Sequence, residues 1–174
     1  MLEAIRLSQL VKPLGASLVG QDASFDSVSI DARTVVEGGM FIALAGDHAD
    51  GHDFVSQARA KGAAAAMVAY VVDDPLPQLL VHDCRYALGQ LGALAREAFT
   101  APVLAITGSS GKTSVKEMLA SILRERGPVL ATLGNLNNEL GVPLTLLALE
   151  SKHQFAVIEM GAAVQGDISY SMNM

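Results

Sequence analysis

The chain has 174 residues, of which 51% are hydrophobic and 17% charged, a composition typical of a globular protein with one large or two small domains. A net charge of −6 without any block of lysine or arginine argues against a nucleic-acid partner, and no apolar run approaches the roughly 20 residues of a membrane helix. The single cysteine, Cys84, excludes an internal disulfide and a cysteine metal cluster, and its helical register predicts a small buried side chain. We therefore expect a cytoplasmic protein without membrane insertion.

The first half of the chain alternates short apolar runs with polar turns. A short helix is predicted at residues 7–10, with Ser8 as its N-cap and Pro13 and Gly15 just past its end. The elements predicted after it are strands over 28–31 and 40–44, a helix over 54–60 capped by Asp53 and ended by Gly62, and strands over 64–72 and 78–81. This alternation favours the α/β class.

A proline-containing polar break precedes the last of these strands, and a longer helix follows that strand. Asp83 is predicted to cap this helix, which runs to about Phe99 with alanine and leucine on one face. We place a domain boundary at residues 82–84, so that the domains are 1–82 and 83–174.

The second domain is built around an apolar strand that runs into a glycine-rich loop. Val103–Ile106 is typical of a buried parallel strand. Small residues after it let successive backbone N–H groups point at an anion, and Lys112 adds a positive charge. Thr113 or Ser114 supplies a hydroxyl of the kind that completes the shell of a phosphate-bound Mg²⁺. The loop predicted to bind phosphates consists of Thr107, Gly108, Ser109, Ser110, Gly111, Lys112 and Thr113.

A helix must follow this loop, because the free N–H groups of its first turn would add to the phosphate site. The apolar residues recur at steps of three and four and predict its buried face: Val115, Met118, Leu119, Ile122 and Leu123. Lys116 and Glu117 lie off that stripe. The general phosphate-loop pattern has a glycine where this chain has Ile106, and a glycine-rich turn without a ligand is the alternative.

Two polar features follow the loop helix. A strand over 128–131 leads to a loop with Asn137 and Asn138, whose amides suit a nucleotide or diphosphate, although asparagine also favours plain turns. Glu159 ends a buried strand over 155–158. Because ligands collect at the carboxyl ends of parallel strands, we expect Glu159 to face the crevice of Lys112 and to bind Mg²⁺. A carboxylate that caps a neighbouring helix is the alternative.

The first domain has its own polar cluster, which includes Asp31, Arg33, Asp50 and His52. Arg33 suits a diphosphate or a uracil edge, but it can equally form a weak ion pair with Asp31. A histidine in a turn, such as His52, is at least as often structural as ligand-binding.

Together these motifs resemble the ATP-dependent Mur ligases of peptidoglycan synthesis. The resemblance covers the whole chain and rests on TGSSGKTSVKEM at 107–118, GNLNNELGVPLTLL at 134–147 and VIEMGA at 157–162, with D-x-R at 31–33, MFIALAG at 40–46 and DGHDF at 50–54. The phosphate loop is shared by all members and by folylpolyglutamate synthetase. The asparagine stretch favours the members that add D-alanyl-D-alanine.

The resemblance implies a ligase that joins D-alanyl-D-alanine to UDP-N-acetylmuramoyl-tripeptide through an acyl phosphate, with ATP and Mg²⁺. Domain 1–82 would hold the UDP end of the substrate, and domain 83–174 would be the start of a parallel-sheet ATPase domain. Lys112 and Glu159 would be catalytic, and Thr113 and Glu159 would hold Mg²⁺. The implied substrate-binding residues are Asp31, Arg33, Gly46, Asp50, His52, Asn137 and Asn138. We expect a monomer when the protein is full length.

The chain also departs from the family pattern. Ala32 stands where relatives often have a hydroxyl, and Asp167 stands where a glutamate is usual. Relatives continue beyond the equivalent of Met174 with more of the central sheet, a carbamylated lysine, a metal-binding histidine and a third domain, so we expect this chain alone to be inactive. The alternatives are another ligase of the family, a P-loop kinase or NTPase, and a nucleotide-binding module without turnover.

Overall fold

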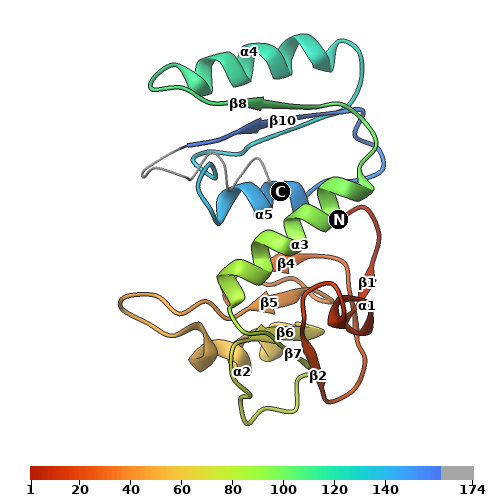
Figure 1. Ribbon diagram of the computed structural model, residues 1–174, viewed down its shortest axis with the longest axis vertical. Coiled ribbons are helices and arrows are strands. Elements are labelled where there is room, and N and C mark those ends of the chain that lie inside the picture. The colour runs from red at the N-terminus through yellow and green to blue at the C-terminus, as the bar shows by residue number, and fades with distance from the viewer. Residues whose placement is uncertain (162–174) are drawn as a thin grey trace. The chain divides into compact units, whose positions relative to one another are not determined.

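The computed structural model describes residues 1–161, and the chain forms two compact units (Figure 1). One unit consists of residues 3–88, and the other begins at Gly89 and includes Met1 and Leu2. The division falls within helix α3, Cys84–Ala98. The predicted boundary near residues 82–84 stays a proposal, and Asp167 lies outside the described residues.

The unit of residues 3–88 is organised around a five-stranded sheet. Its strand order is β2-β7-β6-β5-β4, parallel except for β2, which pairs antiparallel with β7. β1 and β3 form a separate antiparallel pair. The elements are β1 Ile5–Arg6, α1 Leu7–Val11, β2 Ser17–Val19, β3 Ser24–Phe25, β4 Val28–Ser29, β5 Met40–Ile42, the 3₁₀ helix η1 Gly51–Phe54, α2 Val55–Ala60, β6 Ala65–Val68 and β7 Gln78–Leu80.

Helix α2 covers one face of this sheet. Val55 and Ala58 of α2 pack in one cluster with Phe41 of β5 and with Ala66 and Val68 of β6, all buried. Ala66 and Val68 are two residues apart, so they point to the same face of the strand. Burying this face holds the loops at the ends of β4 and β5 in place.

Up to residue 161, the second unit is a three-stranded parallel sheet with helices on both faces (Figure 1). Its strand order is β8-β10-β9, so the last strand of the described residues is central. Its elements beyond α3 are β8 Val103–Ile106, α4 Lys112–Arg124, β9 Val129–Ala131, α5 Gly141–Leu147 and β10 Phe155–Glu159. Alternate residues of β10 face opposite helices, since Val157 packs with Ala120 of α4, whereas Ile158 packs with Val142 of α5. The predicted α/β class is confirmed.

Two predicted helix caps are wrong. Ser8 lies inside α1 and bonds through its hydroxyl to Asp22 at 2.8 Å, while the N-cap position is Arg6. Asp50, not Asp53, accepts the N–H of His52 and caps η1, which leads into α2. Neither the long-range hydrogen bond of Ser8 nor the 3₁₀ turn before α2 can be predicted from the spacing of neighbouring residues. Asp83 is a cap as predicted, because its carboxylate accepts the Tyr86 N–H at 2.8 Å.

The predicted buried face of α4 is largely wrong. Val115, Met118 and Ile122 are 48%, 59% and 66% exposed. Leu119 and Leu123 are partly buried beside Ala120, and the remaining buried position on this face is Lys116. The helix therefore turns its 116–119–120–123 stripe, rather than its most apolar stripe, to the sheet.

Several elements were not predicted, and β8 is less buried than expected. The elements without a prediction are β1, β2, β3 and α5. β8 pairs parallel with β10 as predicted, but within residues 1–161 it is an edge strand, and Ala105 in it is exposed. Edge position is a property of the assembled sheet, which a run of apolar residues does not encode.

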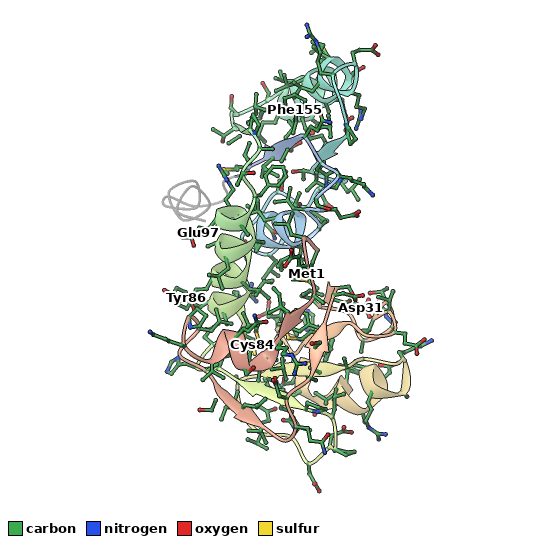
Figure 2. The ribbon with its side chains drawn as sticks, turned by 90° about the vertical axis from the view of Figure 1, so that its right-hand side faces the viewer. Met1, Asp31, Cys84, Tyr86, Glu97 and Phe155 are labelled. Atoms are coloured by element: carbon green, nitrogen blue, oxygen red, sulfur yellow. The ribbon has the colours of Figure 1, made fainter. Side chains whose placement is uncertain are left out.

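Cys84 is buried as predicted and lies at the start of α3, whereas Tyr86 points away from that helix and is 59% exposed (Figure 2). Burial raises the pKa of the Cys84 thiol to about 12. Within the described residues, no helix is long and apolar enough to cross a membrane.

Candidate nucleotide and substrate sites

The glycine-rich loop connects the end of β8 to the start of α4. Gly111 has φ +74°, a left-handed conformation that a side chain would strain, and α4 begins directly after it at Lys112. The Lys112 Nζ donates to the carbonyl oxygen of Gly108 at 2.8 Å and closes the turn. Ile106, where the general pattern has glycine, is the last residue of β8, and its carbonyl oxygen accepts the Met160 N–H at 2.8 Å. The departure therefore lies in the strand and leaves the loop intact.

Glu159 lies at the carboxyl end of the central strand and is 2% exposed. One carboxylate oxygen, Oε2, accepts the Thr113 hydroxyl at 3.1 Å, and the other, Oε1, accepts the Asn137 amide at 2.8 Å. The backbone N–H of Glu159 donates to the Thr132 hydroxyl at 2.9 Å. The structure thus brings together a loop threonine, an asparagine and an acid that are far apart in sequence.

The chemistry of this group suits a magnesium ion. A carboxylate and a hydroxyl lie side by side, and hard oxygen ligands of this kind are those that Mg²⁺ prefers. Thr113 and Glu159 are the residues that would hold the ion. Among residues 1–161 there is no group of three or more histidine, cysteine, aspartate and glutamate side chains that could bind a metal.

The loop that contains Asn137 and Asn138 holds Glu159 and the start of α5 in place. Asn137 fixes Glu159 through its amide and accepts the Gly161 N–H through its carbonyl oxygen at 2.7 Å. The Asn138 side chain accepts the Gly141 N–H at 2.9 Å, at the start of α5. Both asparagines therefore have structural partners, and their predicted contacts with substrate stay predictions.

Lys116 is a charged residue of this site that the sequence analysis missed. It is 1% exposed, and its Nζ donates to the carbonyl oxygen of Thr132 at 2.7 Å. The same nitrogen lies 3.9 Å from Glu159 Oε2. The signal that could have found it is its position one turn after Lys112, on the same stripe as Ala120 and Leu123.

The unit of residues 3–88 has a separate open pocket of about 580 Å³. The ends of β4 and β5 and the start of α2 line it, including Asp31, Ala32, Arg33, Phe41, Phe54 and Gln57. Ala32, the departure from the family pattern, thus lies in the pocket wall with an apolar surface.

Asp31 and Arg33 form a close ion pair in the pocket wall. The Arg33 Nη2 lies 2.7 Å from Asp31 Oδ2, and its side chain is 77% exposed. Hydrogen bonds from the Arg33 side chain, then from its backbone N–H, lower the pKa of Asp31 to about 2. The ion pair named as an alternative for Arg33 therefore exists, and both of its residues line the pocket.

His52 is 3% exposed, and both of its ring nitrogens are engaged. The Ala69 N–H donates to Nε2 at 2.8 Å, so the ring proton lies on Nδ1, which donates to Asp50 Oδ1 at 2.6 Å. The ring stacks on Tyr70 at 4.0 Å, and the Tyr70 hydroxyl donates to Asp50 Oδ2 at 2.8 Å. No ring nitrogen is left for a ligand, which matches the structural alternative. Tyr70 was not predicted to take part.

Gly46 and Gly51 shape the loop that joins this cluster to the pocket. The Gly46 N–H donates to the Ala49 carbonyl at 3.0 Å and closes a tight turn. A Cβ at Gly51 would lie 2.6 Å from the Leu44 backbone nitrogen, so only glycine fits there. The cluster of Asp50 and His52 thereby fixes the pocket wall that Ala49 and Gly51 contribute.

We expect Asp50 to make this unit sensitive to acid. The backbone N–H of His52, then its ring and the Tyr70 hydroxyl, lower the pKa of Asp50 to about 2 from an ordinary 3.8. Because the folded-state pKa is the lower one, the stabilisation is complete above about pH 4 and is lost as the pH falls toward about 2. Urea unfolding should be measured between pH 2 and 7. As the pH falls from about 4 to about 2, the free energy of unfolding should decrease less for Asp50→Asn than for wild type. Asp47→Asn, in the same loop and exposed, should follow wild type, and equal slopes for all three would contradict the assignment.

Sequence and structure comparisons agree on one family. A model of the Mur ligase middle domain matches residues 106–173, and a model of the Mur ligase family catalytic domain matches residues 24–96. The chain is 48% identical over 171 residues to the UDP-N-acetylmuramoyl-tripeptide–D-alanyl-D-alanine ligase of Escherichia coli K12, covering 98% of this chain and 38% of that protein. The chain thus spans little more than a third of the length of this relative.

Solved structures give the same result. A crystal structure of MurF from Acinetobacter baumannii has a TM-score of 0.90 and 44% identity, covering 98% of this chain and 38% of that one. MurF ligase from Thermotoga maritima, solved in complex with ADP, has a TM-score of 0.74 and 34% identity, covering 83% of this chain and 34% of that one. From its sequence and its fold, this chain belongs to the Mur ligase family.

Proposed function

We propose that the full-length protein containing this chain is an ATP-dependent ligase that joins D-alanyl-D-alanine to UDP-N-acetylmuramoyl-tripeptide. The observation that carries the proposal is the contact between Thr113 of the glycine loop and the buried Glu159. The relatives at 48% and 44% identity, a named ligase of this type and a MurF, support it. We place the protein in the cytoplasm, where its nucleotide substrates would be found, and expect a monomer.

The second unit would bind ATP. The exposed residues of the loop, 107–111, offer backbone N–H groups and hydroxyls to phosphate oxygens, and the first turn of α4 adds its own N–H groups. Lys112, now bonded to Gly108, would turn its ammonium to the phosphates. Mg²⁺ held by Thr113 and Glu159 would neutralise part of the phosphate charge. The ADP-bound relative supports this assignment.

The unit of residues 3–88 would hold the UDP end of the peptide substrate. Its pocket has about 580 Å³, a size within the range of small-molecule sites. Arg33 provides a cation at its wall, and Asp31 orients that cation. His52 would contribute by holding Asp50 and the neighbouring wall rather than by direct contact.

The chemistry is a phosphoryl transfer followed by an acyl transfer. A carboxylate oxygen of the peptide attacks the γ-phosphorus of ATP, ADP leaves, and the product is an acyl phosphate. The amine of D-alanyl-D-alanine then attacks the carbonyl carbon, phosphate leaves with the former carboxylate oxygen, and a proton is released as the amide forms. The contribution of this chain is to bind and orient the nucleotide, with Lys112 stabilising charge on the transferred group.

Phosphate release by the full-length protein tests the proposal. We expect release only when ATP, UDP-N-acetylmuramoyl-tripeptide and D-alanyl-D-alanine are all present. Conversion of ATP to ADP without the dipeptide would indicate an NTPase if phosphate is released and a kinase if it is not, and dependence on a single amino acid instead would indicate another ligase of the family. Nucleotide binding without any turnover would indicate a binding module. Each of these three results would overturn the proposal.

Arg33 provides a second prediction. Arg33→Ala should weaken binding of UDP by about tenfold to a hundredfold, because a charge-assisted contact to a phosphate is lost. Arg59→Ala is a matched control, since Arg59 is in the same unit and pairs with Asp74 at 3.0 Å but does not line the pocket. Titration calorimetry with UDP checks both variants. If Arg33→Ala and wild type bind UDP with equal affinity, Arg33 does not contact UDP.

A further inference from the structure

The ammonium of Lys116 is buried beside the carboxylate that would bind the metal. The side chain is 2% exposed, and its Nζ contacts three oxygens: the Thr132 carbonyl at 2.7 Å, Glu117 Oε1 at 3.0 Å and Glu159 Oε2 at 3.9 Å. A buried cation is costly unless it is paired and hydrogen-bonded. Lys116 meets both conditions, and it does so at the edge of the proposed nucleotide site.

The geometry couples this lysine to a single oxygen of Glu159. Thr113 and Lys116 are one turn apart on α4, and both approach Oε2. Thr132 completes the network, because its hydroxyl accepts the Glu159 N–H while its carbonyl oxygen accepts the Lys116 Nζ. The ammonium is therefore fixed from the side of β9 and stays near Glu159.

The charges around Glu159 determine which ligands the site accepts. The negative charge of Glu159 already has a positive partner at 3.9 Å, and this partner is buried and hence weakly screened. Among the described residues, Glu117 is the other charged group paired with the ammonium, and its side chain is 57% exposed and well solvated. A divalent cation alone would meet a compensated carboxylate and a nearby ammonium. Nucleotide phosphates would supply the negative charge that the site lacks.

We infer that Lys116 is a positioning residue that makes Glu159 bind a divalent cation only together with nucleotide phosphates. The inference rests on the proposed function, because it assumes that the loop of residues 107–113 binds a nucleotide. Lys116 itself acts through Glu159 and not by contact with the substrate. It sets the charge of the site and holds Glu159 through Thr132.

Metal binding to the full-length protein tests this, with Mn²⁺ as a probe detected by electron paramagnetic resonance. Wild type should bind Mn²⁺ at least about a hundredfold more weakly without ADP than with it. Lys116→Met and Lys116→Gln should each raise the affinity for Mn²⁺ alone by about tenfold or more, because the repelling charge is removed. In double variants that also carry Glu159→Gln, this increase in affinity for Mn²⁺ should be lost. Lys152→Met is the matched control and should behave as wild type, since Lys152 is an exposed lysine of the same unit that pairs with Glu150 at 2.7 Å rather than with Glu159.

The two Lys116 variants also separate folding from charge. Lys116→Met leaves the Thr132 carbonyl without its donor, whereas Lys116→Gln keeps an N–H donor in that position. Folded variants with unchanged affinity for Mn²⁺ alone overturn the inference while leaving nucleotide binding, and so the proposed function, intact. If neither variant folds, the test uses wild type alone: Mn²⁺ binding that is equally tight with and without ADP also overturns the inference. Failure of wild type to bind ADP overturns the proposed function itself.

Discussion

Replacing Lys112 with alanine is expected to reduce ATP-dependent phosphate release by the full-length protein about a hundredfold to a thousandfold. The ammonium is the positive charge of the glycine loop, and among the described residues its partner is a neutral carbonyl, that of Gly108. It is therefore available to phosphate oxygens, where removal of one preorganised charged contact has an effect of this size.

The fold should survive this change, because Lys112 lies at the surface end of α4 and alanine is a good helix former. Steady-state phosphate release and a thermal melt of the same preparation check both points. Lys152→Ala is the control, since Lys152 forms an exposed ion pair with Glu150 at 2.7 Å. Activity of Lys112→Ala within tenfold of wild type would contradict the role of the loop.

Replacing Gly141 with alanine is expected to lower the free energy of unfolding by about 3 kcal/mol, at the upper end for overpacking. A Cβ at Gly141 would overlap the backbone of Leu136, lying 2.6 Å from its carbonyl oxygen and closer still to its Cα and carbonyl carbon. Backbone cannot rotate away as a side chain can. The loop that carries Asn137 would have to move, and with it the support of Glu159.

Gly134→Ala, in the same loop, is the matched control. A Cβ there meets no atom within 4 Å, but its φ of +53° should still cost about 1 kcal/mol. Urea unfolding should give the order Gly141→Ala, Gly134→Ala, wild type in increasing stability. ADP titration of the same proteins checks whether the support of Glu159 is disturbed. If Gly141→Ala is no less stable than Gly134→Ala, the close approach to Leu136 is not as the structure has it.

Helix α4 shows how far periodicity can predict burial. The three- and four-residue spacing correctly predicted a helix after the loop. It did not predict which stripe faces the sheet, because an apolar stripe and the Lys116 stripe share the same period. Burial of Lys116 depends on the Thr132 carbonyl, just after β9, and on Glu159 at the end of β10. Partners distant in sequence cannot be inferred from the helix alone.

The pocket of the first unit shows a similar limit. The sequence indicated Asp31, Arg33, Asp50 and His52 as a polar cluster, and the structure divides it in two. Asp31 and Arg33 line the pocket, whereas His52 is closed off by Asp50, Tyr70 and the Ala69 N–H. The engagement of His52 depends on β6 lying beside β5, which local residue types do not reveal.

By itself, the sequence determined the glycine loop, its lysine and an acid at a strand end, because each follows from residues within a few positions of one another. Only the tertiary structure decided that β10 lies between β8 and β9. That order brings Glu159 to Thr113 across 46 residues and buries Lys116 beside it. The physical reason is that the stable strand order is the one in which helices cover both faces of the sheet. This condition applies to the whole unit rather than to any one segment.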